Sequence, residues 1–240
     1  MGYCPEILRR LLIIMWRDLR VVLLGVLLLG PPRLCAEVGP LLTSWLAAQT
    51  NVQSWSADFI QTRTLKSLTE PLSVTGHVWF AFPNLFRWEL GNPPQTIAVR
   101  EPRELLIIYP KLKRAEHFPL SGGRAGVWGE ALELLKAGFP RSQTELEAQY
   151  TIVSQTVNGH ACTVVLKPKS ADVRRMMPQI RIDFDKTDFS LLATELQFAD
   201  GTTLRNDFQN PVTNPKLEQS LFTPVIPPDY KNVEPLKERR

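Results

Sequence analysis

The sequence predicts an α+β fold that is mainly antiparallel β: one strongly curved sheet with helices against its concave face, which form a lid over an apolar cavity. Three observations support this fold class. About ten short segments of alternating or continuous apolar residues follow one another along the chain. One helical pattern precedes these segments and another interrupts them. The strand–helix–strand alternation that would predict a parallel sheet is missing from the sequence.

Residues 1–36 are typical of a signal peptide. The charged segment Met15–Arg20, the apolar run Val21–Leu29 and a polar stretch ending at Ala36 follow in the order of export signals. The apolar run is about half as long as a membrane-spanning helix requires. We therefore expect cleavage after Ala36 and an exported protein that is soluble after cleavage. Two alternatives stay open: translation that starts at Met15, and a retained anchor helix.

Charge and cysteine content exclude several classes of protein. The net charge is +4, and residues 1–36 hold five arginines against two acidic side chains, so the rest of the chain is nearly neutral. Such a chain lacks the clustered basic face of a nucleic-acid-binding protein. Cys4 and Cys35 fall in the expected signal peptide, which leaves Cys162 and no disulfide framework. We expect residues 37–240 to form a single monomeric domain that depends on its hydrophobic core and binds no nucleic acid.

In the first half of the chain, we expect one helix followed by strands. The segment Pro40–Thr50 is expected to be helical because its leucines and Trp45 recur at helical spacing. The segment Gly76–Leu90 divides at Pro83 into two aromatic-rich strands, because proline cannot donate to a strand ladder. Further strands are expected at 56–64, 95–100 and 104–109. The last of these is apolar at nearly every position, so we expect it to be covered on both faces or to border a cavity.

In the second half, a short helical region separates two groups of strands. Apolar residues return to helical spacing over 127–135, and Ser142 with Glu145 forms the capping box of a further short helix. Strands are then expected at 150–156, 161–168, 179–185, 191–199 and 202–209, with Asn158-Gly159 as a hairpin turn between the first two. We expect the proline-rich tail from Asn210 to wrap the surface or to fray.

Signals of catalysis are weak. The three histidines sit on separate segments without metal-ligand spacing, and the sequence has no nucleophile elbow, zinc-protease motif or phosphate-binding loop. Asp183, Asp185 and Asp188 lie close together but lack the glycine and the bidentate glutamate of a calcium loop, so we interpret them as a solvated turn. Cys162 lies on an apolar strand face, which indicates a buried structural thiol. We therefore expect no enzyme activity, no cofactor and no metal site.

Two stretches, Trp55–Thr64 (WSADFIQTRT) and Val78–Trp88 (VWFAFPNLFRW), resemble the periplasmic outer-membrane lipoprotein carrier (LolA-like) family. The resemblance extends, more weakly, over residues 40–230. It implies an open β-barrel closed by helices that binds lipoprotein acyl chains in an apolar cavity. It also implies two partners, an inner-membrane lipoprotein-releasing transporter and an outer-membrane acceptor. Phe86 matches the family's aromatic residue that matters for handing over cargo.

One departure from the family concerns the closing of the lid. Many carriers place an arginine just before the motif proline, where it hydrogen-bonds the lid shut, whereas this sequence has Phe82 at that latch position. Apolar contacts are therefore expected to replace a polar latch. This difference keeps open a carrier of another lipid or glycolipid. An envelope-stress sensor or interaction module of the same fold is a further alternative.

The residues expected to bind acyl chains form two groups. The sheet wall comprises Phe80, Phe86, Trp88, Leu90, Ile97, Val99 and Ile107. The lid comprises Val127, Trp128, Leu132 and Leu135. The alternative interpretation is that the aromatic residues are ordinary core, since large apolar side chains are usually buried for packing alone.

Overall fold

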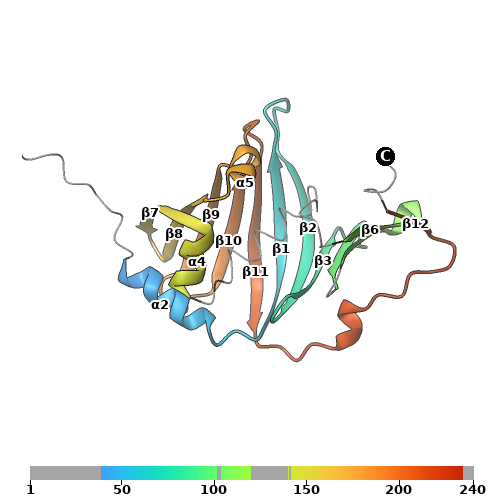
Figure 1. Cartoon of the computed structure of the whole chain (residues 1–240), viewed down its shortest axis with the longest axis horizontal. Helices are drawn as coiled ribbons and strands as arrows, with labels where there is room; N and C mark the ends of the chain where they lie inside the picture. The colour runs from blue at the N-terminus through green and yellow to red at the C-terminus, as the bar shows by residue number, and fades with distance from the viewer. Residues whose placement is uncertain (1–38, 102–103, 120–139, 141, 235–240) are drawn as a thin grey trace, which may run out of the picture. The chain divides into compact units, whose positions relative to one another are not determined.

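The computed structural model describes residues 39–101, 104–119, 140 and 142–234 (Figure 1). The chain divides into two compact units, Met1–Glu37 and Val38–Arg240, and every described residue belongs to the second. The expected signal peptide and the four expected lid residues Val127, Trp128, Leu132 and Leu135 lie outside the described residues. Among the helices of the described part, none is long and apolar enough to cross a membrane.

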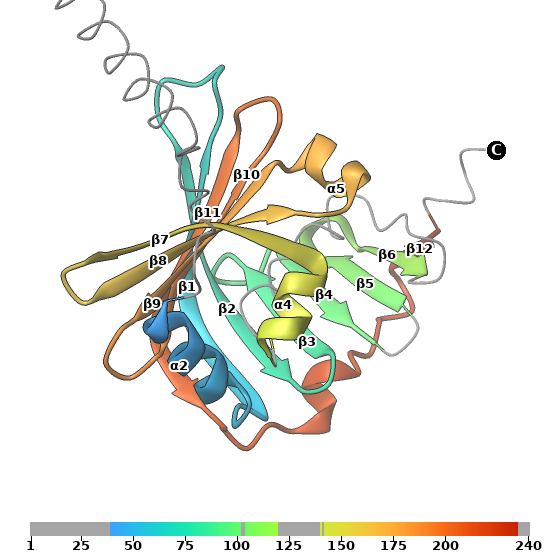
Figure 2. The ribbon, with the colours of Figure 1, turned by 60° about the vertical axis from the view of Figure 1, so that its left-hand side comes forward.

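The described strands form one sheet whose order is β12-β6-β5-β4-β3-β2-β1-β11-β10-β9-β8-β7. All neighbours are antiparallel except β12 and β6, which are parallel. Because β12 and β7 stand at opposite ends of this order, the sheet is not closed, and Figure 2 shows its curvature. The expected curved, open, mainly antiparallel sheet is thus confirmed. The strands are β1 (Ser54–Thr64), β2 (Leu72–Ala81), β3 (Leu85–Leu90), β4 (Thr96–Arg100), β5 (Glu104–Tyr109), β6 (Arg114–Pro119), β7 (Tyr150–Asn158), β8 (Ala161–Pro168), β9 (Gln179–Asp185), β10 (Leu191–Gln197), β11 (Thr203–Thr213) and β12 (Lys231–Val233).

The described helices are short. They are α2 (Pro40–Gln49), α4 (Gln143–Gln149), α5 (Ala171–Met176) and the 3₁₀ turns η1 (Pro110–Leu112) and η2 (Gln219–Phe222). α2 matches the expected first helix, and Ser142 caps α4 by accepting a hydrogen bond from the Glu145 amide at 3.1 Å. Trp45 of α2 stacks on Phe184 of β9 with ring centroids 4.9 Å apart. α2 and α4 lie side by side on one face of the sheet, as Figures 1 and 2 show.

That face, which we call the inner face, holds the main core. Residues paired across antiparallel strands share a face, so the register assigns each strand position to one side. On the inner face of β8 and β9, Cys162, Val164, Ile182 and Phe184 are almost fully buried. They belong to the same cluster as the buried leucines of α2 and α4 and the aromatic residues of β1 to β3. Burial of Cys162 confirms its interpretation as a structural thiol.

The opposite, outer face carries a second small core beneath the chain's later residues. Leu106 and Ile108 of β5 pack there with Ala115, against Ile226 and Tyr230. Residues 214–234, which we call the tail segment, run from the end of β11 through η2 to β12 (Figure 1). The expectation that the tail wraps the surface is confirmed for these residues. β5 is covered on both faces, as its continuous apolar sequence predicted.

Charged residues of the outer face form ion pairs rather than a ligand site. Asp183 accepts hydrogen bonds from Arg181 and Arg205 at 3.0 Å each and from Thr163 at 2.7 Å. It is buried in the middle of β9, so its interpretation as part of a solvated turn is wrong, although Asp185 and Asp188 do cap the turn that follows. The strand pattern did not predict this burial, because Arg205, the partner on β11, is remote from Asp183 in the sequence.

Candidate functional site

The inner face of β1 to β6 is built as transverse rows of side chains. The row nearest the β2–β3 turn comprises Trp55, Phe80, Phe86, Arg100, Leu105 and Phe118, one from each strand in order, and we call it the rim row. The next row comprises Ala57, Val78, Trp88, Ala98 and Ile107. Apart from Arg100, all of these side chains are apolar. The two rows therefore form a continuous hydrophobic wall across five strands.

Aromatic contacts continue the wall beyond β2. Phe59 lies tilted against Trp88 with ring centroids 4.2 Å apart, and Trp55 meets the edge of Phe208 at 5.0 Å. Phe59 can reach across β2 because its partner in the register is Gly76, which has no side chain. A Cβ built on Gly76 lies 2.2 Å from the Phe59 Cζ atom and 2.3 Å from the Glu89 carbonyl oxygen. The glycine is thus required for the ring to lie over the strand.

Four of the expected wall residues, Phe80, Phe86, Trp88 and Ile107, lie together on the inner face and are buried. Leu90 also lies there and is partly buried. Their shared placement agrees with the expected wall, while their role in binding stays a prediction. Phe82, at the latch position, packs against the same cluster and meets Phe80 edge-on at 4.8 Å.

Ile97 and Val99 were expected on the same wall, and this placement is wrong. Both lie on the outer face, because Ile97 pairs with Glu89 and Val99 pairs with Arg87 in the register of β3 and β4. Ile97 packs against the second core beneath the tail segment. The inner positions of β4 are instead Ala98 and Arg100. Choosing the larger apolar residues of this strand gave the wrong face.

Arg100 was consequently not expected on the inner face. It stands between Phe86 of β3 and Leu105 of β5 in the register, and its Nε atom is buried. The alternation of side chains along a strand places Arg100: once Trp88 is assigned to the inner face, its partner Ala98 faces inward, and so does Arg100 two residues later. A guanidinium here is the charged member of an otherwise apolar row.

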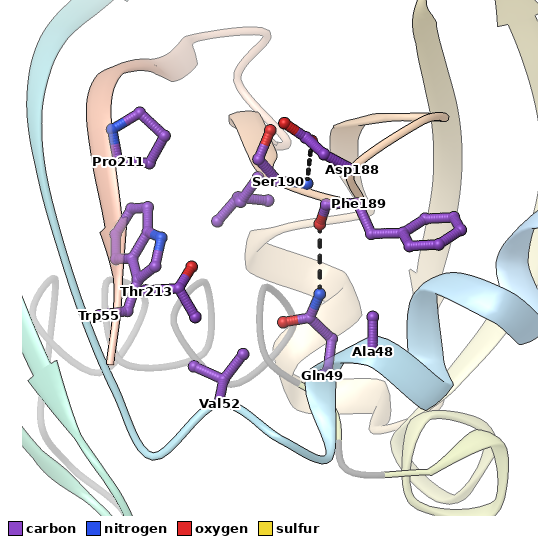
Figure 3. A pocket seen from close by; sticks show the side chains of 10 residues that line it. Ala48, Gln49, Val52, Trp55, Asp188, Phe189, Ser190, Pro211 and Thr213 are labelled. Carbon is purple, nitrogen blue, oxygen red and sulfur yellow. Dashed lines mark hydrogen bonds between the residues drawn. The ribbon is translucent and has the colours of Figure 1, made fainter. Parts of the chain in front are cut away.

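A pocket of about 290 Å³ opens beside the wall, between the end of α2, the start of β1, the β9–β10 turn and the end of β11. Figure 3 shows Trp55, which belongs to the rim row, on one side of it and Gln49 on the other. The Gln49 amide donates a hydrogen bond to the Phe189 carbonyl at 3.5 Å. The pocket is lined by Ala48, Gln49, Val52, Trp55, Asp188, Phe189, Ser190, Leu191, Pro211 and Thr213.

This pocket combines an apolar wall with a polar border. Val52, Trp55 and Leu191 are buried, whereas Asp188 is exposed and its carboxylate accepts a hydrogen bond from the Ser190 amide at 2.8 Å. Three segments far apart in the sequence, 48–55, 188–191 and 211–213, form the pocket, which is why no local pattern predicted it.

The described residues offer little to a reaction mechanism. Burial raises the pKa of the Cys162 thiol above its usual value, which disfavours the reactive thiolate. His77 contacts Asp58 at 2.7 Å on the outer face, away from the aromatic wall. Within the part of the chain that the structure describes, no three histidine, cysteine or acidic side chains are grouped to hold a metal.

Comparisons with known proteins found several solved structures that are similar to this chain. Similar structures include an uncharacterized conserved protein from Thermus thermophilus, with 11% identity, a TM-score of 0.47 and coverage of 79% of this chain and 94% of that one. A LolA superfamily protein from Nitrosomonas europaea has 9% identity, a TM-score of 0.40 and coverage of 75% and 96%. The Mycobacterium tuberculosis lipoprotein LppX has 8% identity, a TM-score of 0.38 and coverage of 74% and 96%.

At these identities and TM-scores, the structural likenesses do not bear on function. No curated protein sequence matches the chain. A family model does match it: the model of the outer membrane lipoprotein carrier protein LolA covers residues 50–225, from the residue after α2 to the tail segment. Because this match spans most of the chain, the protein belongs to the LolA family of outer membrane lipoprotein carrier proteins.

Proposed function

We propose that the protein is a periplasmic carrier that binds the acyl chains of lipoproteins against its inner face and transfers them from the inner to the outer membrane. The observation that supports this most is the two-row apolar wall across β1 to β5, which includes Phe80, Phe86 and Trp88. Family membership adds to it. Binding by such a wall needs no reaction chemistry, so we propose a carrier rather than an enzyme.

The energetics of an apolar wall suit a cargo that must be both held and released. Burying one methylene group contributes about 0.8 kcal/mol, so fifteen methylenes of one acyl chain supply roughly 12 kcal/mol before the opposing terms are counted. Association and chain ordering remove about 4–15 kcal/mol of this gain. The net affinity is therefore moderate and responds strongly to how much of the chain is covered. A partner that uncovers part of the wall would release the cargo.

Two membrane partners follow from this proposal. An inner-membrane lipoprotein-releasing transporter would load the wall, and an outer-membrane acceptor would unload it. The sequence has no nucleotide-binding motif, so we propose that docking to these partners, rather than nucleotide hydrolysis by this chain, drives opening. Under this proposal the wall residues Phe86 and Trp88 contact the acyl chain directly.

A second candidate is a carrier of another lipid or glycolipid. The observation that favours it is Phe82, whose ring packs against Phe80 where many carriers have a latch arginine. A carrier that holds its cavity shut by apolar contacts alone would open differently and accept a different cargo.

Native mass spectrometry of the full-length gene product, purified from its own envelope without detergent, tests the proposal. A bound triacylated lipoprotein supports the leading candidate, and a bound free lipid or glycolipid supports the second. If the purified protein carries no ligand and acyl chains displace no apolar dye from it, the wall residues serve only as hydrophobic core and the proposal is wrong. Phe86→Asp and Trp88→Asp should abolish binding, whereas Val212→Asp, an exposed site on β11, serves as the matched control.

A further inference from the structure

The side chain of Gln49 is a buried amide whose two ends have different surroundings. Gln49 is the last residue of α2, and only 4% of its surface is exposed. Its amide nitrogen donates to the Phe189 carbonyl at 3.5 Å, and this bond fixes the orientation of the amide, because only the nitrogen can donate to a carbonyl. The Oε1 atom accepts no hydrogen bond from any residue that the structure describes. A ligand that donates to this oxygen would therefore remove the cost of a buried acceptor without a partner.

This oxygen faces the pocket beside the aromatic wall. Figure 3 shows Gln49 on one side of the pocket, with its oxygen turned toward the side that Val52 and Trp55 form. Both of these residues and Leu191 are buried and apolar, so the amide oxygen is set among apolar side chains. Such surroundings lower the local dielectric constant and strengthen a hydrogen bond that forms there.

The charge that borders the pocket is negative. Among the described residues that line it, Asp188 alone is charged, and its carboxylate accepts a hydrogen bond from the Ser190 amide at 2.8 Å. A carboxylate has about four lone-pair sites, so this contact leaves Asp188 able to accept further hydrogen bonds. Lys186 lies in the same turn but is exposed and does not line the pocket. The lining therefore favours a ligand group that donates hydrogen bonds and carries positive charge.

We infer that this pocket binds a primary ammonium group at the head of an acyl-chain ligand, with Gln49 Oε1 as the hydrogen-bond acceptor and Asp188 as the opposite charge. This inference rests on the proposed function, because Trp55 belongs both to the pocket and to the rim row of the wall that would hold the chain. An ammonium group has three donors and no acceptor, which matches this lining. The volume of about 290 Å³ corresponds to about ten water-sized groups, enough for a small head group.

This assignment narrows the cargo of the proposed carrier. A lipoprotein whose N-terminal cysteine carries two acyl chains keeps a free α-amino group, which is mostly protonated at pH 7. A third acyl chain on that nitrogen converts it to an amide, which keeps one N–H donor and loses the charge. Lipids with a simple amine head share the ammonium chemistry. A phosphate next to the ammonium group would find no cation among the described lining residues.

Displacement of the uncharged dye N-phenyl-1-naphthylamine from the full chain tests the inference. Three ligands share a twelve-carbon chain: dodecylamine carries the ammonium group, N-dodecylacetamide a neutral N–H, and methyl dodecanoate no donor. Dodecylamine should bind the unchanged protein most tightly. Gln49→Met, which keeps the length of the side chain without the amide, should weaken dodecylamine binding about tenfold to a hundredfold, as expected for loss of a charge-assisted hydrogen bond. Asp188→Asn should weaken it only about twofold to fivefold, because this carboxylate is exposed.

Asp185→Asn is the matched control, since Asp185 lies in the same turn, is exposed and does not line the pocket. It should change none of the three affinities. Binding of methyl dodecanoate should stay within twofold in every variant, which shows that the wall is intact; if Gln49→Met weakens it further, Asp188→Asn decides. Equal affinities of the unchanged protein for the three ligands, or unaltered dodecylamine binding in both pocket variants, would refute the inference and leave the carrier function in place. If no ligand displaces the dye from the unchanged protein, the proposed function fails as well.

Two lipopeptides separate the sources of the ammonium group. One is a short peptide whose N-terminal cysteine carries a dipalmitoylglyceryl group and a free amine, and the other is its N-acetyl form. A preference for the free amine that Gln49→Met removes assigns the pocket to lipoproteins with two acyl chains. Equal affinities for the two peptides, with dodecylamine still preferred over N-dodecylacetamide, assign it to an amine-headed lipid.

Discussion

Gly76 allows the sharpest test of how the aromatic wall is built. In the Gly76→Ala variant, the new methyl group would sit 2.2 Å from the Phe59 Cζ atom and 2.3 Å from the Glu89 carbonyl oxygen, well inside contact distance. The ring can rotate away, but the carbonyl belongs to the backbone of β3 and cannot move without disturbing the β2–β3 pairing. Overpacking of this kind typically costs about 1–3 kcal/mol, and the backbone clash sets our expectation at the upper end, about 3 kcal/mol.

The assay is urea unfolding followed by tryptophan fluorescence, together with thermal unfolding. For a chain of this size, about 3 kcal/mol corresponds to a fall in Tm of roughly 6–12 °C. Gly39→Ala is the control, since the closest atoms there belong to the flexible end of the Gln155 side chain. Adding Phe59→Leu to Gly76→Ala should restore only part of the stability, because the Glu89 clash remains. A Gly76→Ala variant within about 0.5 kcal/mol of the unchanged protein, the usual range for a substitution without structural consequence, would refute the reasoning.

Three further predictions concern buried or paired polar groups. Asp183→Ala should destabilise the fold by about 1.5–3 kcal/mol, because it removes a buried carboxylate that accepts hydrogen bonds from Arg181, Arg205 and Thr163; a loss below about 1 kcal/mol in urea unfolding, the size of an exposed ion pair, would contradict this. Burial opposes the charged form of His117, but its contacts with Asn232 and Glu104 outweigh burial and raise the pKa of His117 above its usual value. Protonated His117 therefore stabilises the fold at low pH, and this stabilisation is lost as pH rises through the folded-state pKa. His117→Ala should therefore remove a stability difference between about pH 5.5 and pH 8, which bracket the ordinary histidine pKa, and an unchanged difference would refute the assignment. In a chain whose other two cysteines are serine, Cys162 should react with a thiol reagent only after unfolding, and fast reaction of the folded protein would contradict its burial.

Local signals predicted most of the fold. The helix α2 follows from its leucine spacing, and the hairpins follow from turn residues and alternation, because these patterns involve neighbours in the sequence. The two apolar faces of β5 were also readable, since Leu105 and Ile107 face the main core while Leu106 and Ile108 face the second. The sequence did not predict which residues cover the outer face of β5, because Ile226 and Tyr230 belong to the tail segment, far along the chain.

The same limit explains the errors in the site. In β4, Ile97 is larger and more apolar than Ala98, so hydrophobicity alone points it toward the main core. It faces outward because the tail segment supplies Ile226 and Tyr230 to cover the outer face. The same choice left Arg100 out of the expected wall, and the pocket beside Trp55 was not predicted because three segments that are remote from one another in the sequence form it. Long-range partners, rather than weak local patterns, were the missing information.

The parallel pairing of β12 with β6 has a consequence for biogenesis. Lys231 to Val233 are synthesised after the other eleven strands of the sheet, yet they pair with the strand next to β5. Until they emerge and dock, β6 presents an unpaired edge and the second core around Leu106 lacks its cover. Folding of this half therefore finishes with the tail segment, and a nascent or truncated chain passes through a stage that is prone to aggregate. An early-acting chaperone would find its target on the outer side of the sheet, opposite the wall that we propose carries the cargo.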